Sequence, residues 1–315
     1  MKGTFITPLL LILSALLFAG CNGGTVSDQE DNNEKLTVYT TIFPIEDFAK
    51  KIGGNHVEVQ SVYPPGADAH TYEPSVKKMM SIAEADLLMY NGAGLESFIE
   101  KIDNTLKDEN VVKVEVSEEI ELLAGKDGEE HGHESSNEHH HHDLDPHIWI
   151  DPEKAIMMAD HIKNALIEEK PSAQSEFEHN FKELKTRLEQ LDTQFRAVVD
   201  SASRKEILVS HAAYGYWEHR YGIKQISITG LSSENEPSQK QLQHIIETVK
   251  DRQIQYLIYD QNPKTKVAET IQKETGTDAL TLHNLEYITE EDKQNREDYF
   301  SIMEKNIDTL KKALQ

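Results

Sequence analysis

Three histidines at the ends of β-branched runs are the residues of this sequence best placed to do chemistry. His70 follows a turn-rich segment after the run Val57–Val62, His147 lies just before an expected helix, and His211 ends the run Ile207–Ser210. Sheets with helical connections bind ligands where a strand ends and a helix begins. A single such ring often serves only a structural hydrogen bond. Three of them, spread over both halves of the chain, predict one shared metal-binding cleft, because neutral imidazole is the commonest metal ligand.

A second group of histidines lies in residues 125–143, a stretch of charged, polar and glycine residues without any apolar side chain. Its histidines are His131, His133, His139, His140, His141 and His142. A segment with nothing to bury is expected to remain a mobile loop, and ordering it costs conformational entropy. We therefore expect weak binding of first-row divalent metals here, at variable stoichiometry. A solvated spacer without a role is the alternative interpretation.

Composition restricts the ligands and the partners. The chain has 315 residues, enough for about two domains of roughly 150 residues each. A formal net charge of -24 excludes nucleic acid, whose binding depends on neutralising phosphates. Cys21 is the single cysteine, so disulfide frameworks and thiolate clusters are excluded, whereas histidine occurs 15 times. A metal site in this chain must therefore use imidazole and carboxylate groups.

The N-terminus predicts the compartment. Residues 1–20 have the layout of a secretory signal peptide, with an apolar run at 9–19 that is short for a membrane span. The segment 17–21 resembles a bacterial lipobox, so we expect cleavage to leave Cys21 as a lipidated first residue. Residues 21–34 would then form a flexible tether. This predicts a lipoprotein on the outer face of the cytoplasmic membrane; the alternative is a free cysteine in an uncleaved anchor.

Short β-branched runs alternate with helical stretches in both halves of the chain. In the first half, residues 35–170, they lie at 35–41, 44–52, 57–62, 74–85, 87–90, 95–106 and 111–116. In the second half, residues 204–315, they lie at 206–209, 213–221, 223–228, 239–252, 254–259, 264–274, 279–282 and 298–314. Such alternation predicts the α/β class, with two (β/α) lobes built on mostly parallel sheets and covered by helices.

A long amphipathic helix is expected between the halves, over residues 171–203. Its apolar positions are spaced alternately by four and three residues: Phe177, Phe181, Leu184, Leu188, Leu191, Phe195 and Val198. One face of a continuous helix is therefore apolar. We expect this helix to bridge the two lobes and to pack against both. A dimeric coiled coil is the alternative, since heptad spacing produces the same stripe.

Three segments of the chain resemble a known family. They are residues 65–74 (Pro-Gly-Ala-Asp-Ala-His-Thr-Tyr-Glu-Pro), 145–152 (Asp-Pro-His-Ile-Trp-Ile-Asp-Pro) and 210–216 (Ser-His-Ala-Ala-Tyr-Gly-Tyr). They are similar, in the same order, to motifs of the metal-specific (cluster A-I) solute-binding lipoproteins of bacterial ABC transporters, in the zinc-specific ZnuA/AdcA-type branch. The resemblance extends from about residue 35 to the C-terminus and implies two (β/α) lobes bridged by one rigid helix.

The resemblance implies a ligand set. His70, His147 and His211 match the metal ligands of the family, and Glu286 in the segment 281–286 matches its coordinating carboxylate, with His283 or water as the alternative fourth ligand. Three imidazoles and one carboxylate suit Zn²⁺. Manganese-binding relatives resemble this chain but have Glu at the position of His211, so this residue favours zinc. Nearby acidic residues that would either orient the rings or cap turns are Asp68, Glu73, Asp145 and Asp151.

The resemblance implies a monomeric extracytoplasmic protein, not an enzyme, that captures Zn²⁺ and delivers it to a membrane permease. The alternatives are a manganese-binding lipoprotein or adhesin, a zinc-dependent hydrolase, and a binding protein for an organic solute. The hydrolase would need an open coordination position, which Glu286 closes. The organic solute would need Tyr72, Trp149 and Trp217 as stacking surfaces.

Overall fold

A parallel sheet forms from the short aliphatic runs of the first half of the chain. The computed structural model describes residues 34–105, 109–125, 144–232, 237–261 and 265–315. The strands are β1 (Leu36–Thr40), β2 (Val57–Ser61), β3 (Leu87–Tyr90) and β4 (Val112–Glu115), all paired in parallel in the order β2-β1-β3-β4. The helices between them are α1 (Phe43–Gly53), α2 (Val76–Ala83) and α3 (Ile99–Thr105).

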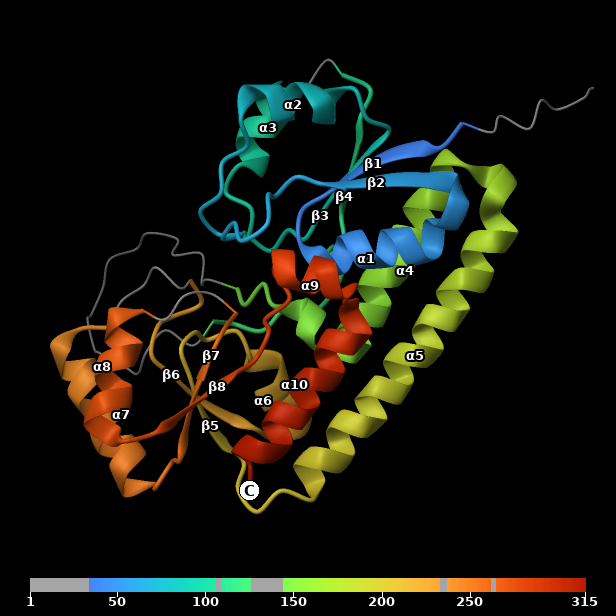
Figure 1. The fold of residues 1–315 in the computed structure, drawn as a ribbon. Coiled ribbons are helices and arrows are strands. Elements are labelled where there is room, and N and C mark those ends of the chain that lie inside the picture. The colour runs from blue at the N-terminus through green and yellow to red at the C-terminus, as the bar shows by residue number, and fades with distance from the viewer. Residues whose placement is uncertain (1–33, 106–108, 126–143, 233–236, 262–264) are drawn as a thin grey trace, which may run out of the picture. The chain divides into compact units, whose positions relative to one another are not determined.

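A second sheet repeats this topology in the other half (Figure 1). Its strands are β5 (Glu206–Val209), β6 (Lys224–Ser227), β7 (Tyr256–Tyr259) and β8 (Asp278–Thr281), again parallel, in the order β6-β5-β7-β8. The intervening helices are α6 (Gly215–Tyr221), α7 (Gln239–Asp251) and α8 (Lys266–Thr275). The chain thus has the predicted α/β class, with two lobes built on parallel sheets.

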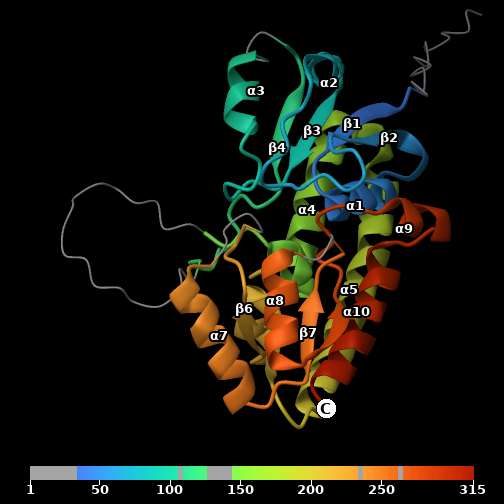
Figure 2. The same ribbon diagram turned by 60° about the vertical axis from the view of Figure 1, so that its left-hand side comes forward.

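One long helix, α5 (Gln174–Asp200), runs beside both lobes (Figure 1 and Figure 2). It follows α4 (Pro152–Glu169) and a 3₁₀ turn at Pro171–Ala173, and it contacts α1, α4 and α10 (Tyr299–Ala313). Its buried face consists of Phe177, Leu184, Leu188, Leu191, Phe195 and Val199. Because helices of the same chain cover this face, the apolar stripe needs no second copy, and the coiled-coil alternative loses its basis.

The structure differs from the sequence prediction in several details, among them the first residue of α3, which is Ile99 where the sequence predicted residue 95. The helix expected from residue 74 begins at Val76, because Ser75 has extended backbone and its hydroxyl caps the helix by accepting from the Lys78 amide. A short helix, α9 (Glu290–Asn295), has no buried residue and therefore no apolar periodicity to predict it. On α5 the last fully buried position is Val199 and not Val198. In the described part of the chain, none of the helices has the length and apolar character of a membrane span.

Buried aromatic side chains connect the lobes through the segment 145–151. The indole of Trp217 donates to the Ile150 carbonyl at 2.8 Å, and the hydroxyl of Tyr299 donates to the Trp149 carbonyl at 2.6 Å. The Trp149 indole donates in turn to the Asn284 carbonyl at 2.7 Å. Because Trp149 and Trp217 are fully buried, neither offers a stacking surface to an organic solute. These bonds fix the 3₁₀ turn Ile148–Ile150 that follows His147.

Candidate metal centre

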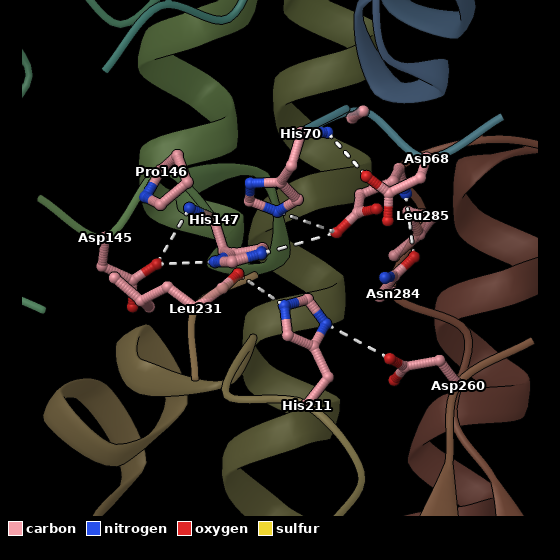
Figure 3. Close-up of polar contacts among 12 residues, drawn as sticks. Asp68, His70, Asp145, Pro146, His147, His211, Leu231, Asp260, Asn284 and Leu285 are labelled. Atoms are coloured by element: carbon pink, nitrogen blue, oxygen red, sulfur yellow. Dashed lines mark hydrogen bonds and ion pairs between the residues drawn. The ribbon is translucent and has the colours of Figure 1, made fainter. Parts of the chain in front are cut away.

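Four side chains from both lobes converge on one point. His70, His147, His211 and Glu286 each offer one ligand atom, and these atoms all lie within 4.8 Å of one another. Figure 3 shows the three imidazole rings lying close together. His70 follows β2, His211 follows β5 and Glu286 follows β8. The carboxyl ends of three parallel strands therefore supply ligands, which is where open α/β sheets bind them. In the described part of the chain this is the single cluster of its kind.

Three of the ligand atoms are buried without a hydrogen-bond partner: Nε2 of His70, Nε2 of His147 and Oε1 of Glu286. The carboxylate oxygen lies 3.8 Å from the His70 nitrogen and 3.5 Å from the His147 nitrogen, too far for hydrogen bonds. Donors of tetrahedral zinc lie about 3.3 Å apart, given bonds of about 2.0–2.1 Å. Buried polar atoms without partners are costly, so this group fits a small cation after modest contraction.

Asp145 orients His147. Its Oδ1 atom lies 2.8 Å from Nδ1 of the ring and also accepts the His147 amide at 3.0 Å. This contact directs Nε2 toward the other ligands, an arrangement typical of metal-binding histidines. Burial would lower the pKa of His147, but hydrogen bonds to Asp145 and the proximity of Glu286 outweigh it and raise the pKa to about 9.

His70 is held through its backbone. The Oδ1 atom of Asp68 accepts the His70 amide at 3.0 Å and the Thr71 amide at 3.1 Å, which fixes the turn that carries the ring. Burial lowers the pKa of His70 to about 4, and the attraction of Glu286 only partly compensates. The ring is therefore neutral at physiological pH and ready to bind a metal.

His211 has two polar neighbours besides the ligands (Figure 3). Its Nδ1 atom lies 3.2 Å from Oδ2 of Asp260, and its Nε2 atom lies 2.7 Å from the carbonyl oxygen of Leu231. The Tyr214 hydroxyl donates to the other oxygen of Asp260 at 3.2 Å. Burial would lower the pKa of His211, but the hydrogen bond and charge of Asp260 raise it.

Glu286 is buried and charged. Burial would raise the pKa of its carboxyl, but the proximity of His147 and of the other two imidazoles outweighs burial and lowers the pKa to about 2. His283 lies outside the group, because its Nδ1 atom accepts the Leu285 amide at 2.9 Å and its Nε2 atom faces Asp292 at 3.3 Å. Both ring nitrogens of His283 are therefore engaged elsewhere.

The acidic residues near the motifs divide among three roles. Asp145 contacts a ligand ring, whereas Asp68 fixes a turn, Asp151 caps α4 through the Glu153 amide, and Glu73 pairs with Lys101 on the surface. Sequence reasoning missed Asp260, which contacts His211. Its signal was its position directly after the run that forms β7, where a parallel sheet places its ligands.

Two expected features lie outside the described residues. Cys21 is in the segment 1–33, and the histidine-rich stretch falls almost wholly in 126–143. The backbone on either side of that stretch is described: Ala124 and Leu144 form an antiparallel bridge.

Two parallel-sheet lobes, a long connecting helix and a ligand cluster between the strand ends define a metal-binding solute-binding protein. The family model for the zinc-uptake complex component A, ZnuA, matches residues 38–313, and the chain belongs to this family. The zinc-binding lipoprotein AdcA of Streptococcus pneumoniae is 34% identical over 98% of this chain, which spans 60% of that relative. The high-affinity zinc uptake system protein ZnuA of Bacillus subtilis is 30% identical over 97% of both chains.

A solved structure matches the fold. It is the Zn(II)-bound ZnuA-like domain of Streptococcus pneumoniae AdcA, with a TM-score of 0.75 and 32% identity, covering 89% of this chain and 99% of that domain. The chain therefore corresponds to the whole of that domain but to little more than half of the complete AdcA relative.

Proposed function

We propose that this chain captures Zn²⁺ at His70, His147, His211 and Glu286 and is the solute-binding component of a zinc-uptake ABC transporter. The observation that carries the proposal is the set of three buried ligand atoms without partners at the meeting point of the two lobes. Three imidazoles and one carboxylate match the donors that Zn²⁺ takes in tetrahedral sites. Membership of the zinc-uptake family supports the same cargo.

The donor set favours zinc over manganese. Mn²⁺ prefers oxygen-rich sites, whereas imidazole suits zinc, and three of the four donors here are nitrogen. A hydrolytic role is disfavoured because a catalytic zinc keeps one position open for water, and Glu286 fills the fourth position. The family consists of solute-binding components and not of enzymes.

Alanine substitution of each histidine tests the site. We expect His70→Ala, His147→Ala and His211→Ala each to weaken zinc binding more than 100-fold, since even indirect supports of a metal site are worth about 10- to 100-fold. His179→Ala and His244→Ala are matched controls, because both side chains are exposed. Zinc affinity is measured by competition with a chelator of known affinity. If the three variants bind zinc like the controls, the cargo is held elsewhere.

We further propose that the chain acts as a monomer anchored through a lipid on Cys21 and delivers its zinc to the membrane permease. The relative named as a lipoprotein supports an extracytoplasmic, membrane-anchored location. Bacterial lipoproteins carry more than one acyl chain, which makes retention durable. Cys21→Ala should therefore release the protein from the membrane fraction. Retention of the variant would indicate an uncleaved anchor.

The histidine-rich stretch is proposed as a secondary, weak metal-binding loop. Because Ala124 and Leu144 pair with each other, a short glycine turn can replace residues 125–143 without separating the neighbouring chain. In calorimetry, the deletion variant should lose the weakly bound zinc ions and still bind one zinc ion tightly. Loss of the tight step would show that the loop, and not the buried group, holds the principal zinc.

A further inference from the structure

His283 stands three residues before Glu286, and the contacts of its ring point to a task other than binding metal. We propose that His283 is a positioning residue that holds the backbone turn carrying Glu286, so that the carboxylate is directed at the zinc. This inference rests on the proposed zinc site. It assigns a role to a side chain that would otherwise be counted as a spare metal donor.

The first observation is the bond between His283 and the residue before Glu286. The Leu285 amide donates to Nδ1 of His283 at 2.9 Å. Leu285 is fully buried and has a φ of 65°, in the left-handed region that a branched residue rarely adopts. Such strained backbone persists only where the surroundings enforce it. The ring of His283 supplies one of the bonds that enforce it.

The second observation is that the ring itself is fixed. Its Nε2 atom faces Oδ2 of Asp292 at 3.3 Å, and the same carboxylate accepts the Thr289 amide at 3.0 Å at the start of α9. Because Nδ1 accepts from the Leu285 amide, the hydrogen of the neutral ring is on Nε2, which donates to Asp292. Asp292 thereby selects the tautomer that leaves Nδ1 free to accept.

The third observation is that the neighbouring residue repeats the arrangement. Oδ1 of Asn284 accepts the Glu286 amide at 3.1 Å and is itself held by the Gln261 amide group at 2.6 Å. Two successive side chains thus each accept the amide two residues ahead. Asn306 fixes the start of the segment by bonding both the amide and the carbonyl of His283 at 2.8 Å.

These supports determine where Glu286 points. Its Oε1 atom, the ligand atom, has no hydrogen-bond partner. The direction of that atom is consequently set by the backbone from which the side chain leaves, and an error of about 1 Å in a supporting element is enough to loosen a metal site. Release of the turn at Leu285 would let Glu286 swing away from the histidines.

Three substitutions of His283 separate its two nitrogens. Asn keeps an acceptor near the position of Nδ1, for the Leu285 amide, but is too short to contact Asp292. Gln can reach Asp292 but has no acceptor at the position of Nδ1. Leu removes both interactions. We expect His283→Leu and His283→Gln to weaken zinc binding about 10- to 100-fold and to speed zinc dissociation. His283→Asn should recover most of the affinity. Equal affinity of His283→Leu and the unchanged protein would overturn the inference.

A double-mutant cycle with Glu286→Gln tests whether the effect passes through Glu286. We expect the penalty of His283→Leu to disappear when Glu286 is already replaced. An undiminished penalty in the Glu286→Gln background would mean that His283 supports the fold generally, and the inference would fail. If Glu286→Gln alone leaves zinc binding unchanged, the proposed site is wrong, which is a distinct result.

Nitrogen NMR of the full, unsubstituted chain tests the inference without a variant, so it does not depend on whether a variant folds. The ring of His283 should show an unprotonated Nδ1 and a protonated Nε2, with and without zinc. Zinc-dependent shifts at Nδ1 or Nε2 of the size seen on metal ligation would make His283 a ligand and would refute the positioning role.

Discussion

The Nε2 atom of His211 lies 2.7 Å from the carbonyl oxygen of Leu231. A carbonyl only accepts hydrogen bonds, so Nε2 donates, while Nδ1 of the same ring faces the carboxylate of Asp260. Both ring nitrogens of His211 are therefore engaged with groups of the protein. Binding of zinc through Nε2 would require that this hydrogen bond to Leu231 be broken.

We accordingly expect the His211 Nε2–H signal to be visible and protected from solvent exchange in metal-free protein and to vanish when zinc binds. The hydrogen on Nε2 of His283 is the internal control and should persist, because it faces Asp292 in both states. Proton NMR with ¹⁵N-labelled histidine measures both. Persistence of the His211 signal in the zinc-loaded protein would place this ring outside the metal site.

Zinc binding should release protons at neutral pH. An ordinary histidine titrates near pH 6.5, but the pKa of His147 is raised to about 9 and that of His211 is also raised, whereas the pKa of His70 is lowered to about 4. Ligand rings must lose their protons to bind a metal. At pH 7.5 we therefore expect release of about one to two protons, and an affinity that increases up to about pH 9.

The free energy of unfolding of the protein without zinc should decrease as the pH rises from about 6.5 to about 9, whereas zinc affinity increases. Because the folded pKa of His147 lies above its unfolded value of 6.5, its contribution is complete below 6.5 and is lost as the pH rises through about 9. Calorimetry in buffers of different ionisation enthalpy counts the protons, and urea unfolding measures stability. Proton release of zero at pH 7.5 would show that all three rings are neutral before zinc binds.

The sequence predicts the α/β class and the convergence of the three histidines, because strand ends in a parallel sheet meet at one edge. It marks Asp260 only as a residue that follows a strand, and it does not show that Asp260 or the Leu231 carbonyl contacts His211, since both reach this ring across the fold from loops of the same lobe. The sequence does not predict the role of His283 either. A histidine close to metal ligands in the sequence looks like a further ligand, and only its contacts with Leu285 and Asp292 show that its ring is engaged elsewhere.

Gly215 should influence zinc binding without touching a ligand. A Cβ atom at this position would clash with Oδ2 of Asp145, whose other oxygen orients His147. Gly215→Ala must displace that carboxylate, so we expect a loss of about 10-fold in zinc affinity. The loss should shrink in an Asp145→Asn background, because the displaced group has then already lost its charge.

Gly222→Ala is the matched control for Gly215→Ala. Gly222 has a φ of 73° with open space around it, so an added Cβ strains the backbone without reaching the site. This control should lower the midpoint of thermal unfolding and leave zinc affinity unchanged. If Gly215→Ala behaves in the same way, its contact with Asp145 has no bearing on the metal.

The selectivity of the site should depend on His211. His211→Glu exchanges an imidazole for a carboxylate and gives two nitrogen and two oxygen donors together with Glu286, a balance that suits Mn²⁺ better than the present one. The structure adds one requirement: Asp260 lies 3.2 Å from the ring of His211, and a second carboxylate there would be repelled. The fair test is therefore the double variant His211→Glu with Asp260→Asn.

Zinc should still bind this double variant, because Zn²⁺ exceeds Mn²⁺ in affinity for most donor sets. The preference for zinc should nevertheless narrow about 10- to 100-fold, which corresponds to about 1.4–2.8 kcal/mol. Asp260→Asn alone is the control for the lost contact between Asp260 and the ring of His211. It should weaken zinc binding without favouring manganese. Competition titrations of both metals measure the ratio. An unchanged ratio in the double variant would mean that the residue at position 211 does not set the choice of metal.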